Sequence, residues 1–488
     1  MKPFASSLAM TLACCVTQAP VAHAEGDGDL SAIREEMKAL REGYDAQRKA
    51  YEARMKALEE RLEKAEARAA AAEAGAAQAR SAAAPAEKAA DNAAMPAPAA
   101  TATDKQTVPN AFNPAISLIL NGAYSNLSQD PNAYKVTGFL SNQDAIAAGK
   151  LPLRRGFGLG ESEMFLTSNI DHLFAGGLNL ALEPDNTVSI EEAFVQTTAL
   201  GHGLTVKGGR FFSALGYQNS VHAHAWDFVD PSLVQNTFFG PNYGDDGLQV
   251  NWVAPVEAVL FEVGAEIGRG KDAPANDRGK NGIASSVYYA HLGGDAGTGG
   301  SYRVGVSTLR TSTGPGGSSV ADLDERTGVV NRFTGDIAVD GLDFVYKWAP
   351  NGDYYYTNLK LAAEWFRMRR DGTLFYDVTG IDRGAGFSSA QSGWYVQGTW
   401  QFHPYWRVGA RYDQLDPGSM SAGVNAQSGI VATTYAPRKY SAMVDWNPSE
   451  FSRIRLQYSR DGSREGLTDN QWFLQYNYSL GTHGAHKF

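Results

Sequence analysis

The stretch RIRLQYS (Arg453–Ser459) decides the class of fold, because its side chains alternate strictly in polarity. Ile454, Leu456 and Tyr458 point to one side of an extended chain, and the polar residues between them point to the other. A helix would mix the two sets on every face. The alternation therefore indicates a β-strand with one apolar and one polar surface.

The same alternation recurs from residue 111 to the end of the chain. It occurs in the runs Ile116–Tyr124, Leu178–Leu182, Val259–Ile267, Tyr302–Thr308, Leu342–Trp348, Trp394–Phe402, Trp406–Asp413, Tyr440–Trp446 and Trp472–Leu480. Gly, Asn, Asp or Pro separates the runs, and aromatic residues stand near their ends. This arrangement is typical of tilted membrane strands of about 9 to 11 residues.

Two folds share this alternation, a transmembrane β-barrel and a soluble sandwich or propeller. Inward Arg and Lys side chains would be hard to bury in a dry core, which favours the barrel. At roughly 24 residues per strand and connection, residues 111–488 predict an all-β transmembrane barrel of about 16 antiparallel strands, with 14 or 18 as alternatives. A barrel of that size encloses an aqueous channel.

Composition narrows the class of protein further. No stretch after residue 24 has the roughly 18 to 20 consecutive apolar residues of a membrane-spanning helix, which excludes a helical membrane protein. The mean hydropathy of −0.31 is compatible with a barrel, because outward apolar and inward polar residues average out. The net charge of −10 argues against nucleic acid as a partner.

Residues 1–24 have the form of a signal peptide. Lys2 precedes an uncharged run, and Ala22-His23-Ala24 has the small-x-small pattern of a signal-peptidase site. Cys14 and Cys15 are the two cysteines of the chain and lie inside this segment. A mature chain without cysteine excludes a thiol enzyme, a disulfide scaffold and a cysteine-ligated zinc site. A lipoprotein cysteine is the alternative.

The segment between signal and barrel divides into two parts. Residues 25–72 are expected to form a periplasmic coiled coil, because from Leu30 to Ala72 the larger apolar residues recur at steps of three and four, with one stutter. A solvated single helix is the alternative. Residues 73–110 are rich in Ala and Pro and are expected to be a linker. The barrel is expected over residues 111–488.

Charged residues on the inward faces of the expected strands are the candidate pore-lining groups. The alternation assigns this role to Arg303, Arg407, Arg411, Arg453, Arg455, Glu161, Glu163, Glu262 and Glu266. The acids belong to the first half of the barrel and four of the arginines to its last strands, which predicts a transverse field across the channel. Ion pairs that stiffen the wall are a compatible alternative.

A second candidate site follows the run of residues 208–216. His222, His224, Asp227 and Asp230 combine imidazole and carboxylate groups, and such donors suit a divalent cation such as zinc. The alternative is a set of loop residues that form hydrogen bonds with the barrel wall. No other cofactor is expected.

Four stretches resemble the central part of the phosphate-selective porin O and P family: Gly208–Gly216, Phe228–Leu233, Phe239–Pro241 and Gly247–Val250. The resemblance covers most of residues 111–488. It implies a trimeric 16-stranded porin with a loop folded into the barrel, and some relatives carry an N-terminal periplasmic coiled coil. Phosphate selectivity rests on rings of Arg and Lys, whereas the inward candidates in this chain carry charges of both signs.

Residues 113–117, 227–230 and 481–488 resemble proteins labelled zinc-regulated or TonB-dependent outer-membrane receptors. A TonB-dependent transporter closes a 22-stranded barrel with a globular plug. Residues 111–488 are too few for 22 strands, and a coiled coil and a linker precede them. The sequence therefore favours a passive channel.

The predicted function is an outer-membrane porin-like channel for passive diffusion of small polar or charged solutes in a Gram-negative bacterium. The alternatives are a zinc-regulated or metal-related uptake receptor and a structural tether. No enzyme is expected, since the chain has neither a G-x-S-x-G nor an H-E-x-x-H motif. Expected partners are outer-membrane lipid, other copies of the chain in a homotrimer, small solutes, and the barrel-assembly machinery through Phe488.

Residues 30–72 are predicted to drive trimerisation. Replacing Leu58 and Leu62 by Asp places charges in the apolar seam and should lower the melting temperature of the isolated helix, followed by circular dichroism. Deleting residues 25–109 should weaken the trimer in detergent. A trimer of unchanged stability after this deletion would mean that contacts between barrels are sufficient.

Overall fold

The computed structural model describes residues 115–131, 134–140, 154–183, 187–240, 242–256, 259–276, 279, 281–314, 316, 318–321 and 329–481, together with Lys38 and Lys56. The predicted signal peptide and linker, nearly all of the predicted coiled coil, the first residues of the predicted barrel and Phe488 lie outside the described residues. Those predictions stand as predictions.

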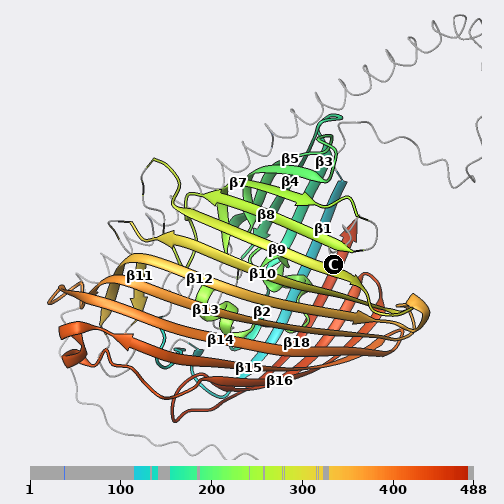
Figure 1. The fold of residues 1–488 in the computed structure, drawn as a ribbon. Coiled ribbons are helices and arrows are strands. Elements are labelled where there is room, and N and C mark those ends of the chain that lie inside the picture. Colours follow the sequence, from blue (N-terminus) through green and yellow to red (C-terminus); the bar gives the residue numbers. More distant parts are fainter. Residues whose placement is uncertain are drawn as a thin grey trace, which may run out of the picture. The chain divides into compact units, whose positions relative to one another are not determined.

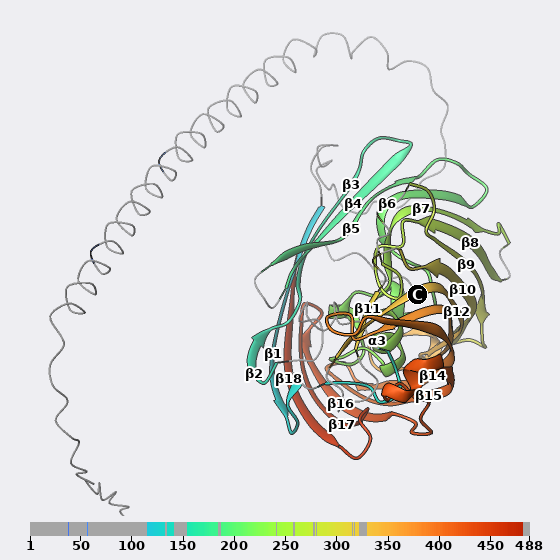
Figure 2. The ribbon, with the colours of Figure 1, turned by 90° about the vertical axis from the view of Figure 1, so that its left-hand side faces the viewer.

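The described residues from 115 onward form a closed antiparallel β-barrel (Figures 1 and 2). They contain 18 strands in 16 positions around the wall, because β2 and β3 both pair with β1, and β10 and β11 both pair with β12. Pairing of β1 with β18 closes the ring. The prediction of about 16 antiparallel strands is confirmed.

In chain order the strands are β1 (Ala115–Leu127), β2 (Gly156–Leu159), β3 (Ser162–Asn169), β4 (Phe174–Leu182), β5 (Val188–Thr197), β6 (Leu204–Phe212), β7 (Gly244–Val253), β8 (Leu260–Gly268), β9 (Ser285–Asp295), β10 (Gly300–Ser312), β11 (Ser318–Ala321), β12 (Val330–Trp348), β13 (Asn358–Tyr376), β14 (Arg383–His403), β15 (Trp406–Ser421), β16 (Arg438–Ser449), β17 (Ser452–Gly462) and β18 (Asp469–Gly481). The described helical elements are η3 (Gln218–Ser220), η4 (Ala223–Ala225), α3 (Leu233–Phe239), η5 (Pro350–Gly352) and η6 (Gly423–Ser428). None of the helices in these residues has the length and apolar character needed to span a bilayer.

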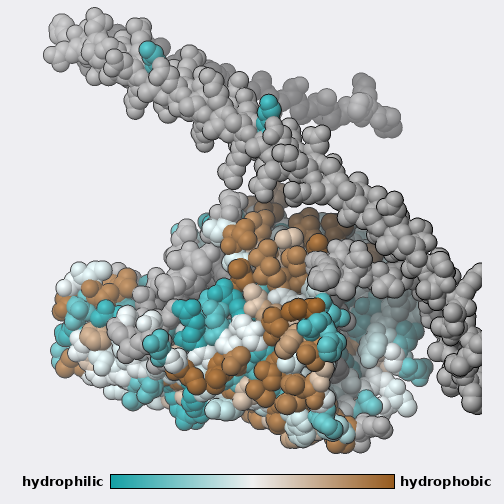
Figure 3. All heavy atoms as spheres, turned by 90° about the horizontal axis from the view of Figure 1, so that it is seen from above, coloured by the Kyte–Doolittle hydropathy of each residue, from teal (hydrophilic) through white to brown (hydrophobic). Residues whose placement is uncertain are grey.

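The alternation predicted for β17 is confirmed at the centre of the strand. Arg455 and Gln457 are fully buried inside the barrel, whereas Leu456 between them is 43% exposed on the outer surface. Outward apolar side chains of this kind recur on neighbouring strands, for example Leu474 and Trp472 on β18. Figure 3 shows hydrophobic side chains gathered in patches on one face of the barrel, beside hydrophilic ones. Such an outer surface suits contact with lipid.

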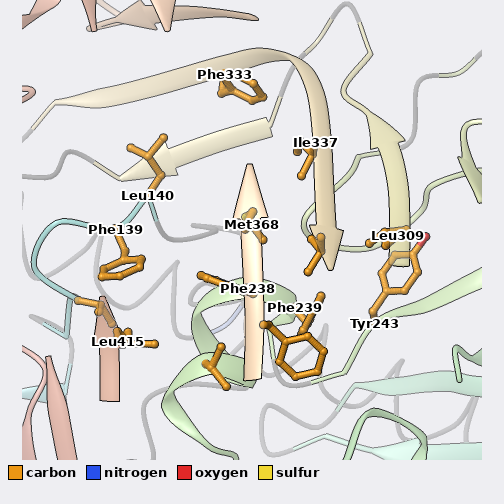
Figure 4. Packing of buried hydrophobic residues seen from close by; sticks show 14 of the residues in the cluster. Phe139, Leu140, Phe238, Phe239, Tyr243, Leu309, Phe333, Ile337, Met368 and Leu415 are labelled. Carbon is orange, nitrogen blue, oxygen red and sulfur yellow. The ribbon is translucent and has the colours of Figure 1, made fainter. Parts of the chain in front are cut away.

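Part of the barrel interior is an apolar core, which the expectation of a water-filled lumen did not include. The long strands β12, β13 and β14, of 19, 19 and 21 residues, turn apolar side chains inward. Helix α3 packs against this wall (Figure 4). The Phe239 and Phe366 rings meet edge to face, with centroids 5.2 Å apart. The alternation of a strand tells which side chains share a face but does not tell whether another segment covers that face.

The substitution Leu456→Arg tests the assignment of faces. Leu456 is predicted to face the bilayer, where an arginine costs about 2 to 4 kcal/mol at the midplane. The free energy of unfolding, measured by urea titration in lipid vesicles, should fall by that order. The control Leu467→Arg changes a residue of similar exposure in the connection between β17 and β18 and should have little effect. Equal losses for both variants would contradict the assignment.

Candidate channel constriction

The connection between β6 and β7 enters the barrel and crosses its interior. We call residues 213–240 the inserted segment. Most of its large apolar side chains are buried, among them Leu215, Phe228 and Val234, and Figure 2 shows α3 within the ring of strands. The loop folded into the barrel, which the family resemblance implied, is confirmed.

The segment begins at a turn that only glycine fits without strain. Gly216 has φ +77°, and a Cβ atom at this position would meet the Glu364 carboxylate and the Phe366 ring of β13. Directly after the turn, the backbone N–H of Tyr217 donates to Glu364 Oε1 at 2.6 Å and that of Gln218 to Oε2 at 3.2 Å. The close approach at Gly216 thus places these two amides on the wall.

Helix α3 closes the segment at its other end. The Ser232 hydroxyl accepts a hydrogen bond from the Gln235 N–H, which caps the helix start, and Gly240 ends the helix in the left-handed conformation with φ 55°. The Leu233 N–H donates to Asp413 Oδ1 of β15 at 3.0 Å. Both ends of the segment are therefore tied to the inner wall by carboxylates.

Asp227 joins the middle of the segment to the basic wall, the part of the inner surface that carries Lys360, Arg407, Arg411, Lys439, Arg453 and Arg455. Lys360 Nζ of β13 lies 2.7 Å from Asp227 Oδ2, and Arg407 Nη1 of β15 lies 3.0 Å from Oδ1. Burial alone would raise the pKa of Asp227, but the charges of Lys360 and Arg407 hold it well below its usual range. The carboxylate is therefore ionised at neutral pH.

Asp230 makes a second contact of the same kind. Its carboxylate accepts from Lys439 Nζ of β16, from Arg411 Nη2 of β15 at 3.2 Å, and from the Gln457 amide at 2.7 Å. Burial would raise the pKa of Asp230, and Lys439 and Arg411 lower it well below its usual range. Because the carboxylate is buried and its charge is compensated from two strands, the contact specifies where the segment sits.

Arginines of the same wall also donate to carbonyl oxygens of the segment. Arg453 Nη2 donates to the His224 carbonyl at 2.7 Å, Arg455 Nη1 to the Trp226 carbonyl at 3.0 Å, and Arg411 Nη2 to the Pro231 carbonyl at 3.1 Å. A guanidinium group can serve a carboxylate and a carbonyl at once because it has five N–H donors. The arginines of the wall therefore bind the backbone of the segment in addition to its side chains.

The opposite side of the segment meets the acidic wall, which consists of Glu163 of β3 and of Glu191 and Glu192 of β5. His224 Nδ1 lies 2.7 Å from Glu163 Oε1 of β3, and His222 Nε2 lies 3.0 Å from Glu192 Oε2 of β5. The two imidazole rings stack with centroids 5.8 Å apart, and the turn of η4 between them brings them together. Burial alone would lower the pKa of His222, but hydrogen bonds to Glu191 and Glu192 raise it well above its usual value.

A β-bulge brings Glu191 to this cluster. Asn179 of β4 pairs with Glu192, and the next residue Leu180 pairs with Ile190, so Glu191 is an extra residue of β5. Alternation would send one of two adjacent glutamates outward, whereas a bulge lets both approach His222. The alternation rule therefore missed Glu191, and only the adjacent pair of acids in the sequence could have suggested it.

The predicted pore-lining residues form two groups. Arg411, Arg455, Glu163 and Glu266 are inside the barrel but buried, and each contacts the inserted segment. The others are half-buried: Arg303 pairs with Asp343 and Glu262 with His291, Arg407 and Arg453 contact the segment at Asp227 and at the His224 carbonyl, and Glu161 precedes β3. For this second group pore lining stays a prediction.

The four predicted metal ligands are not brought together as one set. The histidines lie against the acidic wall, whereas Asp227 and Asp230 are paired with cationic side chains of the opposite wall. The alternative weighed from the sequence, loop residues bonded to the barrel wall, describes the two aspartates. The transverse field predicted from the sequence is opposed by charges of the segment itself.

Comparisons with known proteins point to one family. A family profile described as phosphate-selective porin O and P matches residues 185–471. An uncharacterized protein of Aquifex aeolicus (strain VF5) is 28% identical over 399 residues, which cover 78% of this chain and 80% of that protein.

Two solved structures show a similar course of the chain. Outer-membrane expressed OmpT of Vibrio cholerae is 12% identical, with a TM-score of 0.46 over 76% of this chain and 98% of that one. The anion-selective porin of Comamonas acidovorans is 10% identical, with a TM-score of 0.45 over 75% of this chain and 99% of that one.

The substitution Gly216→Ala tests the entry turn of the segment. A Cβ at positive φ costs about 1 to 2 kcal/mol, and at Gly216 it must also displace Glu364 or Phe366. Gly297→Ala is a matched control, with φ +75° but nothing within 4 Å of the new Cβ. Gly216→Ala should lower the free energy of unfolding by more than the control does. Equal losses would show that Glu364 does not hold the turn.

Proposed function

The chain belongs to the family of phosphate-selective porins O and P and is an outer-membrane channel for solutes, and on this premise we propose that the inserted segment sets the size of its opening. In this proposal the channel is passive and serves small polar or charged solutes. The observation that carries the proposal is the attachment of the segment to both sides of the interior, through Asp227 and Asp230 on the basic wall and through His222 and His224 on the acidic wall.

A segment held at both walls narrows the space left for solutes. Its apolar half, led by α3, packs against β13 to β15, and its polar half spans from β17 to β5. Breaking one buried ion pair by removing one partner typically costs about 3 to 5 kcal/mol. The narrow state is therefore the resting state of the channel, and solutes pass beside a fixed constriction.

We propose a weak preference between anions and cations. The basic wall carries nearly as many carboxylates as cations, because the segment adds two aspartates to those of the strands. The cations are Lys360, Arg407, Arg411, Lys439, Arg453 and Arg455, and the carboxylates are Asp227, Asp230, Asp413, Asp445 and Asp461. With so little uncompensated charge, the potential that acts on a passing ion is small.

The assembly and partners are proposed on sequence grounds. The seam predicted over residues 30–72 supports a homotrimer with its coiled coil in the periplasm. The outward apolar side chains support contact with outer-membrane lipid. Recognition of Phe488 by the barrel-assembly machinery remains a prediction. Family membership favours a channel over an enzyme, a metal-uptake receptor or a structural tether.

Single-channel recording in planar bilayers tests the proposed constriction. The wild-type protein should conduct, with a small reversal potential in a salt gradient. The double variant Asp227→Asn, Asp230→Asn removes two attachments of the segment to the basic wall, so its conductance should be larger and less steady. The control double variant Asp295→Asn, Asp353→Asn changes two exposed carboxylates, one at the end of β9 and one in the connection between β12 and β13, and should conduct like the wild type.

Two outcomes would contradict the proposal. A folded wild-type barrel that does not conduct would argue against a channel and for a tether. Equal conductance in the wild type and in the Asp227→Asn, Asp230→Asn variant would show that the segment does not set the opening.

A further inference from the structure

The acidic wall holds a cluster whose donor atoms converge on one point. The nearest ligand atoms of Glu163, Glu191 and His222 all lie within 4.8 Å of one another. His222 Nδ1 is 3.1 Å from Glu191 Oε2 and 3.3 Å from Glu163 Oε2. Three separate segments supply these residues, namely β3, β5 and the inserted segment.

More polar atoms meet at His222 Nδ1 than one hydrogen bond can pair. His222 Nδ1 faces two carboxylate oxygens and also the Asn179 Nδ2 group at 3.1 Å. If Nδ1 carries a proton, that proton can be donated to only one carboxylate. The amide N–H groups of Asn179 then face a second donor instead of an acceptor. If Nδ1 is unprotonated, its lone pair faces two anionic oxygens. A cation between these atoms would accept lone pairs from all of them.

Asn179 supplies a second, independent indication of a ligand. This residue is 1% exposed, and its Oδ1 atom has no hydrogen-bond partner. Its amide nitrogen contacts Glu163 Oε2 at 2.8 Å and Glu191 Oε2 at 3.3 Å, so the amide is aimed into the cluster. A flip of the amide, which exchanges its oxygen and nitrogen positions, would bring Oδ1 to the same point.

We propose that Glu163, Glu191 and His222 bind one divalent transition-metal ion such as Zn²⁺, with Asn179 Oδ1 as a fourth donor. Bonds of about 2.0 to 2.1 Å in a tetrahedron separate neighbouring ligand atoms by about 3.3 Å, close to the two distances from His222 Nδ1. An imidazole beside carboxylates favours zinc and its neighbours over calcium or magnesium, which prefer oxygen ligands.

The proposed set differs from the one predicted from the sequence. Only His222 is common to both, because Asp227 and Asp230 bind cationic side chains on the other wall. A metal ion at the cluster would join the inserted segment directly to β3 and β5. This metal site does not depend on the proposed conduction of solutes.

Isothermal titration of the full chain with Zn²⁺, in detergent and after removal of chelator, tests the site. The wild type should bind one ion per chain, and Glu191→Gln and His222→Gln should each raise the dissociation constant about tenfold or more. His291→Gln is the matched control, since His291 Nδ1 lies 2.8 Å from Glu262 but no second carboxylate contact to it is present in the described residues. This control should bind like the wild type, and Asp227→Asn should raise the dissociation constant less than His222→Gln does, because Asp227 holds the segment but is not a ligand.

Two results would overturn the proposal. One is the absence of a stoichiometric Zn²⁺ site in the wild type. The other is a dissociation constant that Glu191→Gln and His222→Gln leave unchanged, or that only Asp227→Asn raises. If a variant does not fold, Co²⁺ bound to the wild type decides, because a four-coordinate site gives strong visible absorption and a hydrated surface ion does not.

Discussion

Ion pairs between the inserted segment and the inner wall are the interaction on which the structure of this channel depends. The barrel places acids on β3 and β5 and cations on β13 to β17, and the segment carries histidines toward the first and aspartates toward the second. Strand carboxylates such as Asp413 and Asp445 compensate only part of the charge of the basic wall, and a buried charge without a partner is very costly. The segment and the walls therefore stabilise one another.

An apolar contact complements these ion pairs. Helix α3 covers the inner faces of β13, β14 and β15, where Phe366, Met368 and Leu415 would otherwise be exposed inside the barrel. Burial of such side chains is non-directional, whereas an ion pair with two partners defines a position. Burial of these apolar side chains favours contact between the segment and the wall, and the ion pairs of the buried aspartates favour one placement of the segment.

The sequence predicted the barrel and its faces well, because the strand period of two is a local property. Arg455, Leu456 and Gln457 were assigned to the correct sides, and the inward loop was expected from the family resemblance. Contacts between distant residues were not predictable in this way. The pairing of Asp230 with Lys439 spans 209 residues, and the bulge at Glu191 breaks the rule that assigned the faces. Apolar inward residues such as Phe366 look like lipid-facing ones until a covering segment is known.

A double-mutant cycle between Asp230 and Lys439 tests the central claim most directly. The free energy of unfolding would be measured by urea titration for the wild type, for Asp230→Asn, for Lys439→Met and for the double variant. If the charge pair holds the segment, the two single losses should exceed that of the double variant by about 1 to 3 kcal/mol of coupling. Additive losses, with a coupling energy near zero, would contradict the account.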